Sequence, residues 1–127
     1  MKKTQKNSLL DTTAPILPIG TVAITLGISQ RMLRIYDQEN ILSPKRSAKN
    51  RRNYSLDDIE RGKLILFITR NLTNKLAGVK FILTMLDERK IKPQDYMNYI
   101  NKILKSAKIT VQDSNVPSKR GRKPKKS

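Results

Sequence analysis

Apolar residues first recur with a helical period at residue 19. They are spaced by three and four positions, at Ile19, Val22, Ala23 and Leu26. Gly27 tolerates positive φ, which predicts that this helix ends there. Ser29 is a good N-cap for a second helix from residue 30 to about residue 39. The inward face of that second helix is expected to hold Met32, Leu33 and Tyr36.

Residues 40–71 pass from a loop to a third helix. Pro44 bars further helix, and residues 45–54 show no apolar period. Asn50 suits a turn between two short strands. Ser55 and Asp58 have the spacing of a capping box, which predicts a helix over about residues 56–71. Its apolar run at 64–68 is too continuous for a one-sided helix and indicates packing on two sides.

Two further helices are expected in residues 74–107. The fourth follows Thr73 or Asn74, and Gly78 inside it indicates that another helix approaches closely. Pro93 suits the first turn of the fifth. Their apolar stripes are Leu76, Val79, Leu83 and Leu86, then Met97, Ile100, Leu104 and Ala107. The pattern therefore predicts an all-α fold with a small β-hairpin.

Composition separates two polar ends from this patterned centre. Residues 1–15 carry no periodicity and predict a flexible N-terminal arm. Residues 110–127 are polar and end in a basic run, which predicts a disordered basic tail. A charged joint at 87–92 divides the centre into a domain of residues 16–88 and a helix within residues 89–109.

Charge narrows the range of partners. The 127 residues include 27 basic and 10 acidic ones, a formal net charge of +17. Such an excess attracts polyanions, so nucleic acid is the expected partner and an anionic membrane surface the second choice. The longest apolar run, 64–68, is too short to span a bilayer, and the N-terminus lacks the apolar run of a signal peptide. We expect a cytoplasmic, nucleoid-associated protein.

The chain lacks the residues on which several common kinds of site depend. The chain has no cysteine and no histidine, which removes disulfides, thiol switches and the usual zinc sites. Its acids are scattered, and no glycine-rich phosphate loop or nucleophile motif is present. We therefore expect a protein that is not an enzyme and holds no metal or cofactor.

Cationic side chains gather on the second helix and the loop after it. Arg31 and Arg34 lie three apart on one helix face, where an arginine can bond guanine in the major groove or reach a phosphate. Gln30 can pair with adenine or bond a phosphate. The alternative is that these are ordinary surface side chains, with the arginines paired to Asp37 or Glu39.

The loop itself is expected to grip phosphates beside the groove. Such contacts set position and affinity and carry little sequence information. The cations concerned are Lys45, Arg46, Lys49, Arg51 and Arg52. The alternative is a merely solvated loop. Tyr54, at the end of this loop, is expected to anchor it in the core more than to contact DNA.

The basic tail offers a second contact with DNA. Arg120, Gly121, Arg122, Lys123 and Pro124 are similar to an AT-hook, whose arginines lie along a narrow A·T minor groove. Lys123 interrupts the motif. The alternative is a generic basic tail that releases counterions from DNA.

Residues 19–86 resemble the DNA-binding domain of the MerR family of bacterial transcription regulators. The resemblance rests on IGTVAITLGIS, MLRIYDQENILSP, RRNYS and LDDIERGKLI, taken in order. It implies a winged helix-turn-helix followed by further helices, with phosphate contacts from Arg34 and Tyr36. The expected DNA-binding set is Ser29, Gln30, Arg31, Arg34, Tyr36, Lys45, Arg46, Lys49, Arg51, Arg52, Tyr54, Arg120, Arg122 and Lys123.

Within the family, the stretch LTNKLAGVKFIL resembles the HspR branch of chaperone-gene repressors. That resemblance implies a dimeric repressor of stress genes that binds an inverted repeat in double-stranded DNA, with a chaperone as a possible co-repressor. Met97, Ile100 and Leu104 are expected to form the dimer seam, unless they complete the monomer's core. The alternative function is an architectural DNA-binding protein or an excisionase-like recombination factor.

Overall fold

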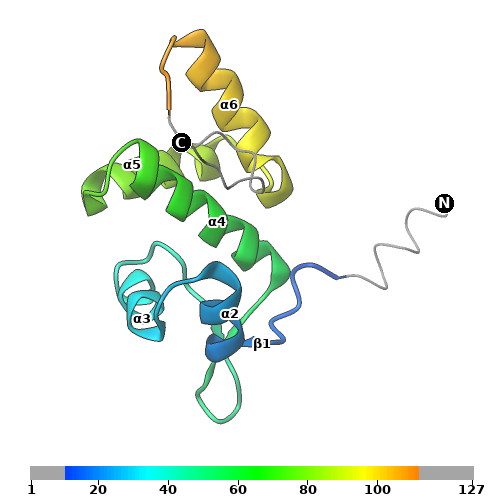
Figure 1. The fold of residues 1–127 in the computed structure, drawn as a ribbon. Coiled ribbons are helices and arrows are strands. Elements are labelled where there is room, and N and C mark those ends of the chain that lie inside the picture. The colour runs from blue at the N-terminus through cyan, green and yellow to red at the C-terminus, as the bar shows by residue number, and fades with distance from the viewer. Residues whose placement is uncertain (1–10, 112–127) are drawn as a thin grey trace, which may run out of the picture. The chain divides into compact units, whose positions relative to one another are not determined.

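The computed structural model describes residues 11–111 and divides into two compact units, residues 1–63 and 64–127. The boundary falls inside one long helix, α4 (Figure 1). In chain order the elements are β1 (Leu17–Pro18), α2 (Ile19–Leu26), α3 (Gln30–Gln38), β2 (Lys45–Arg46), β3 (Arg52–Tyr54), α4 (Leu56–Asn71), α5 (Leu76–Glu88), the 3₁₀ helix η1 (Pro93–Asp95) and α6 (Tyr96–Ser106). The expected mainly helical fold with a small hairpin is confirmed.

The turn between α2 and α3 forms as its residues predict. Gly27 has φ 72°, and its N–H donates to the Ala23 carbonyl at 2.9 Å. The Ser29 side chain then accepts a hydrogen bond from the Met32 N–H at 3.0 Å. The left-handed backbone at Gly27 ends α2, and the Ser29 side chain caps the start of α3. These two residues therefore define the turn between the helices.

A three-stranded antiparallel sheet follows, in the order β1-β3-β2. The β2–β3 hairpin, with its turn at residues 47–51, forms the wing. Asn50 takes φ 61° in that turn, which confirms its expected role. Strand β1 was not expected from the sequence. It pairs Leu17 with Tyr54 and so ties the wing to the start of α2.

The first unit closes around side chains from α2, α3, the loop after α3, β3 and the start of α4. Its buried hydrophobic residues are Val22, Ala23, Leu26, Leu33, Tyr36, Ile41, Leu42, Tyr54 and Ile59.

The capping box of α4 is confirmed: Ser55 N–H donates to Asp58 Oδ2 at 2.9 Å, and Asp58 N–H donates to Ser55 Oγ at 3.1 Å. The Thr12 carbonyl accepts from the Asp57 N–H at 2.9 Å. Packing therefore begins ahead of residue 16, inside the expected arm of residues 1–15.

The second unit contains the rest of α4, with α5, η1 and α6. Its buried hydrophobic residues are Leu64, Ile65, Phe67, Ile68, Val79, Leu83, Leu86, Tyr96, Ile100 and Leu104. The near-continuous burial of 64–68 agrees with packing on two sides.

Two expectations for this unit need correction. Leu76 is 40% exposed, because α5 begins only at that residue and its first turn lies at the surface. A Cβ on Gly78 would lie 2.7 Å from Thr73 Cγ2, so the close neighbour is the preceding turn and not another helix.

None of the helices in residues 11–111 is long and apolar enough to cross a bilayer.

Candidate nucleic-acid interface

Helix α3 divides cleanly into a buried and an exposed face. Leu33 and Tyr36 are buried, at 0% and 6% exposure. Gln30, Arg31 and Arg34 are all exposed on the other side. Arg34 Nη2 donates to Gln30 Oε1 at 3.2 Å, so these two side chains are already aligned along the helix. An aligned amide and guanidinium can present donors to base edges in a major groove.

The wing is held by hydrogen bonds centred on Ser47. Its N–H donates to the Arg51 carbonyl at 2.9 Å, while its Oγ accepts from the N–H groups of Lys49 and Arg51 at 3.2 and 3.1 Å. Arg46 Nη1 also donates to the Asn50 carbonyl at 3.1 Å. These bonds fix the turn that carries the wing's cations.

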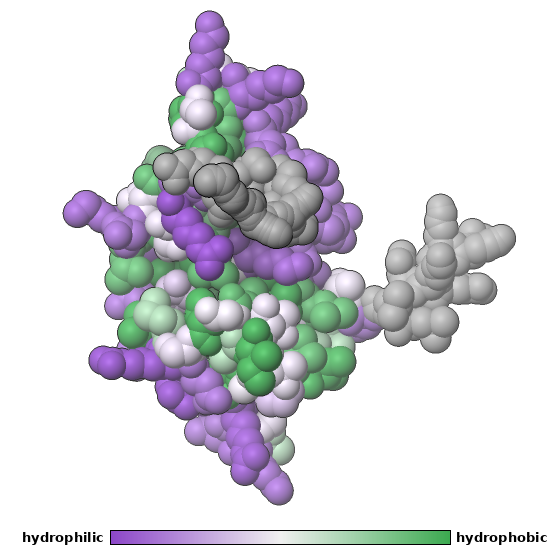
Figure 2. Space-filling view, in the orientation of Figure 1, coloured by the Kyte–Doolittle hydropathy of each residue, from purple (hydrophilic) through white to green (hydrophobic). Residues whose placement is uncertain are grey.

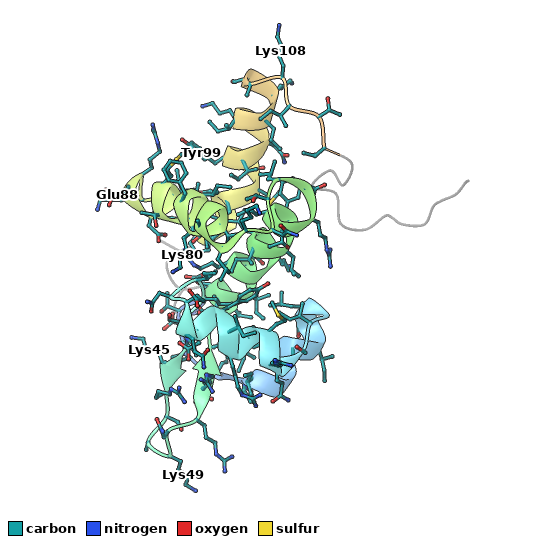
Figure 3. All side chains as sticks on the ribbon, turned by 90° about the vertical axis from the view of Figure 1, so that its left-hand side faces the viewer. Lys45, Lys49, Lys80, Glu88, Tyr99 and Lys108 are labelled. Atoms are coloured by element: carbon teal, nitrogen blue, oxygen red, sulfur yellow. The ribbon has the colours of Figure 1, made fainter. Side chains whose placement is uncertain are left out.

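The wing projects as a hydrophilic tip from the first unit (Figure 2). Lys49 stands at this tip, and Lys45 lies nearer the base (Figure 3). Lys45, Lys49 and Arg51 are all exposed. Solvated cations on a fixed turn suit contacts to phosphates.

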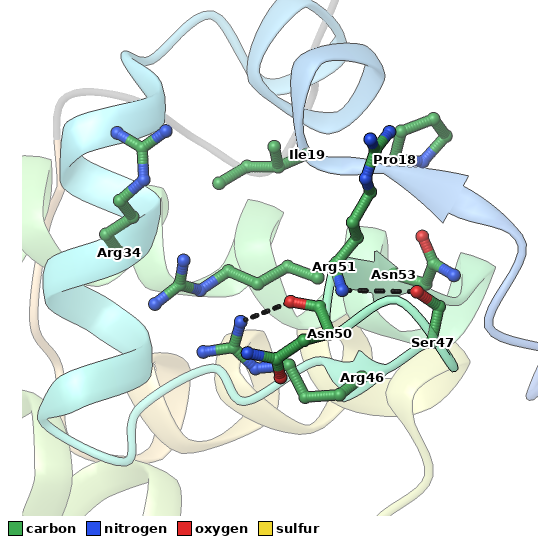
Figure 4. A pocket seen from close by; sticks show the side chains of 9 residues that line it. Pro18, Ile19, Arg34, Arg46, Ser47, Asn50, Arg51 and Asn53 are labelled. Carbon is green, nitrogen blue, oxygen red and sulfur yellow. Dashed lines mark hydrogen bonds between the residues drawn. The ribbon is translucent and has the colours of Figure 1, made fainter.

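An open hollow of about 470 Å³ lies between α3 and the wing. Arg34 borders it from α3, and Arg46, Ser47, Asn50 and Arg51 border it from the wing, with Pro18 and Ile19 beside them (Figure 4). The exposed face of α3 and the wing therefore adjoin one space, as a surface that receives a polyanion requires.

Asp37 is an acidic residue of α3 that pairs with two arginines of the wing. Its Oδ2 accepts from Arg52 Nε at 2.9 Å and lies 3.6 Å from Arg46 Nη2. The sequence alternative that Asp37 pairs with Arg31 or Arg34 is not what the structure shows. Arg52 is consequently engaged within the protein, with its side chain 19% exposed, whereas Arg46 is 42% exposed.

The two tyrosines of the expected set lie in the interior. Tyr54 is 0% exposed, so the expectation that it binds DNA is corrected to the anchoring role. Burial raises the pKa of Tyr54 to about 12, and burial also raises the pKa of Tyr36. Tyr36 is 6% exposed, so nearly all of this residue is packed in the core.

The remaining expected residues differ in how they are placed. Ser29 is exposed, and its Oγ caps the N-terminus of α3. Arg120, Arg122 and Lys123 lie outside the described residues. In the expected dimer seam, Ile100 and Leu104 are buried within the chain, at 7% and 6% exposure, while Met97 is partly exposed. Burial of these two side chains fits the alternative that the stripe completes the core.

Sequence reasoning named Asp37 only as an alternative partner of the α3 arginines, and it did not name Ser47. Asp37 follows Arg34 by three residues, so its place on the same side of α3 was readable, but its wing partners were not. Ser47 precedes Asn50 in a turn, a position at which serine often bonds nearby backbone. In residues 11–111 no cluster of acidic side chains could hold a metal ion.

This chain is similar to known helix-turn-helix transcription regulators. The family described as "MerR HTH family regulatory protein" matches residues 17–86. The transcriptional regulator GlnR of Bacillus anthracis is 33% identical over 79 residues, covering 60% of this chain and 58% of that protein. The regulator TnrA of Bacillus subtilis is 37% identical over 46 residues, covering 36% of this chain and 42% of that protein.

A candidate heat shock protein HspR of Streptomyces coelicolor is also similar. It is 32% identical over 71 residues, covering 56% of this chain and 47% of that protein. The chain thus spans less than two thirds of the length of each of these relatives.

Proposed function

Because this chain belongs to the MerR family of helix-turn-helix regulatory proteins, we propose that it is a transcriptional regulator that binds specific double-stranded DNA. The observation that carries the proposal is the shared hollow between α3 and the wing. Exposed Gln30 and Arg34 lie on one side of α3, and the wing's cations lie beside them.

Each part of this surface has a distinct task. The N-terminal half of α3 enters the major groove, where Gln30, Arg31 and Arg34 contact base edges or nearby phosphates. Lys45, Lys49 and Arg51 hold phosphates beside the groove and set the register of the helix. Arg46 also contacts phosphates, because its ion pair with Asp37 is long, at 3.6 Å, and leaves the guanidinium partly exposed.

The regulator acts as a homodimer on an inverted repeat. Two copies related by a two-fold axis place two α3 helices about one helical turn of DNA apart, which doubles the specific contact area. Exposed apolar side chains on the second unit support self-association. These are Phe81 and Met85 on α5 and Ile103 on α6, at 66%, 42% and 44% exposure.

Repression of stress or chaperone genes is the finer part of the proposal. It is supported by the stretch from Asn74 to Val79 and by the similarity to a protein named HspR. A chaperone co-repressor belongs to the same part of the proposal. Relatives named GlnR and TnrA are also similar, so the controlled genes need a direct measurement.

Genome-wide mapping of bound sites tests both levels. Discrete peaks that share an inverted repeat support a sequence-specific regulator, and peaks before chaperone genes support the heat-shock branch. Peaks at other promoters would reject that branch alone. Even coverage without a shared motif would favour an architectural DNA-binding protein instead.

A further inference from the structure

Asp37 is an acid placed on a surface that the proposed function turns toward phosphates. In Coulomb terms it repels the ligand, so its removal alone should strengthen attraction to any DNA. The Asp37 side chain is only 20% exposed, however, so its carboxylate is largely shielded from solvent. Its placement therefore calls for a different role.

The contacts of Asp37 join two elements that are separate in the chain. Asp37 lies near the end of α3, and Arg52 begins β3, fifteen positions later. The Nε–Oδ2 distance is 2.9 Å, and both side chains are largely shielded from water, at 19% and 20% exposure. Charge-assisted bonds with such geometry are shorter and stronger than exposed ion pairs.

Strand β3, which Arg52 begins, is paired on both sides. Arg52 pairs in register with Arg46 of β2, and its neighbour Asn53 pairs with Pro18 of β1. A bond from Asp37 to Arg52 therefore fixes the middle strand, and with it the wing, relative to α3.

We propose that Asp37 is a positioning residue that raises DNA specificity without contacting DNA. By holding Arg52, it sets the distance between the base-reading face of α3 and the phosphate-binding wing, so that both fit one duplex at once. Arg52 acts as an internal strut, and the phosphate contacts come from Lys45, Lys49 and Arg51. This inference rests on the proposed function.

The test uses the full chain with Asp37→Ala, a change that favours helix, and with Asp37→Asn as the isosteric second variant. Glu88→Ala on α5 is the matched control, because it removes the same charge from an exposed helical site outside the wing. The first readout needs no DNA: the NMR signal of the Arg52 side-chain Nε–H and the ¹⁵N relaxation of residues 47–51. Both Asp37 variants should lose exchange protection at Arg52 and loosen the wing.

The second readout compares affinity for a duplex selected by the wild-type chain with affinity for a scrambled duplex at one salt concentration. The preference for the selected duplex should fall about 10-fold in Asp37→Ala. Binding to the scrambled duplex should hold or strengthen. The double variant Asp37→Ala/Arg52→Ala should be no worse than Asp37→Ala.

Three results would overturn the proposal. The first is an unchanged Arg52 signal in the Asp37 variants. The second is equal strengthening of binding to both duplexes, as in the control. The third is multiplicative losses in the double variant, which would mean that Arg52 itself binds phosphate. If the wild-type chain prefers no duplex, the proposed function fails, whereas the Arg52 signal still reports on the strut.

Discussion

At the scale of single residues, exposure separates the side chains proposed to read DNA from those that hold the fold. Arg31 and Arg34 stand in solvent on α3, while Tyr54 and Leu33 have no exposed surface. Arg52 resembles its neighbours in sequence but is shielded by its bond to Asp37. Substitutions at the exposed positions of α3 and the wing should therefore change binding, and substitutions at buried positions should change stability.

Arg34→Ala should weaken specific binding without unfolding the protein. Loss of a good arginine contact is worth about 1–3 kcal/mol, or roughly 5- to 150-fold in affinity. Arg34 is exposed, and alanine favours helix, so the melting temperature should change little. Fluorescence anisotropy at fixed salt and calorimetry provide the two measurements. A large drop in melting temperature would make Arg34 a structural residue.

Tyr54 should make stability fall at alkaline pH. Its folded pKa of about 12 lies above the ordinary value of 10.0, so the proton is held more tightly in the folded state. The stabilisation is complete below pH 10 and is lost as pH rises through 12, amounting to about 1 kcal/mol between pH 9 and pH 11.

Tyr54→Phe is the matched variant for that measurement. Among the described residues the Tyr54 hydroxyl has no hydrogen-bond partner, so its removal should leave stability at pH 7 equal or higher by about 1 kcal/mol. Urea unfolding at pH 7, 9 and 11 should show a smaller alkaline loss in Tyr54→Phe. Parallel curves for the two proteins would contradict the pKa assignment.

At the scale of elements, caps and turns were predictable because they depend on adjacent residues. Gly27, Ser29, Asn50 and the Ser55–Asp58 pair each act within a few positions of the chain. Strand β1 was missed, because two residues that include a proline carry no periodic signal. It exists through its pairing with β3, which is distant in sequence.

In the candidate site too, features that depend on nearby residues were predicted, and features that depend on distant contacts were not. The exposed arginines of α3 and the basic wing followed from helical period and composition. The Asp37–Arg52 bond did not, because it joins residues fifteen positions apart whose meeting depends on the folded sheet. The burial of Ile100 and Leu104 was equally undecidable, since an apolar stripe looks the same whether it faces its own core or a partner.

Ser55→Ala should destabilise the first unit by removing half of the α4 capping box. The Asp58 N–H loses its acceptor, at a cost of about 1 kcal/mol. Ser43→Ala is the control, since Ser43 is exposed in the loop after α3. Chemical denaturation should resolve the two variants, and equal midpoints would argue against the cap's contribution.

At the scale of the whole molecule, the proposed self-association and the net charge bear on how the protein binds DNA. Phe81→Ser/Met85→Ser should convert a dimer to monomers, because it removes the apolar side chains exposed on α5. Ile24→Ser is the control, since Ile24 is 84% exposed on α2 in the other unit. Sedimentation velocity reports the outcome, and a double variant as dimeric as the wild type would place the interface elsewhere.

The net charge of +17 should make binding strongly dependent on salt. Removal of residues 117–127, which hold Arg120, Arg122 and Lys123, should flatten the plot of log affinity against log salt concentration. Each phosphate that the shortened chain no longer neutralises reduces the steepness of this plot by about 0.9. An unchanged slope would exclude binding of this segment to DNA.

Helix α3 and the wing are proposed to bind one duplex together. NMR chemical-shift mapping of the labelled full chain, with a duplex selected from a random library, tests this. Shifts should concentrate at residues 29–34 and 45–51 at the same time, and they should shrink in Arg34→Ala. Shifts confined to the second unit, or spread evenly over the chain with no selected sequence, would contradict this proposal.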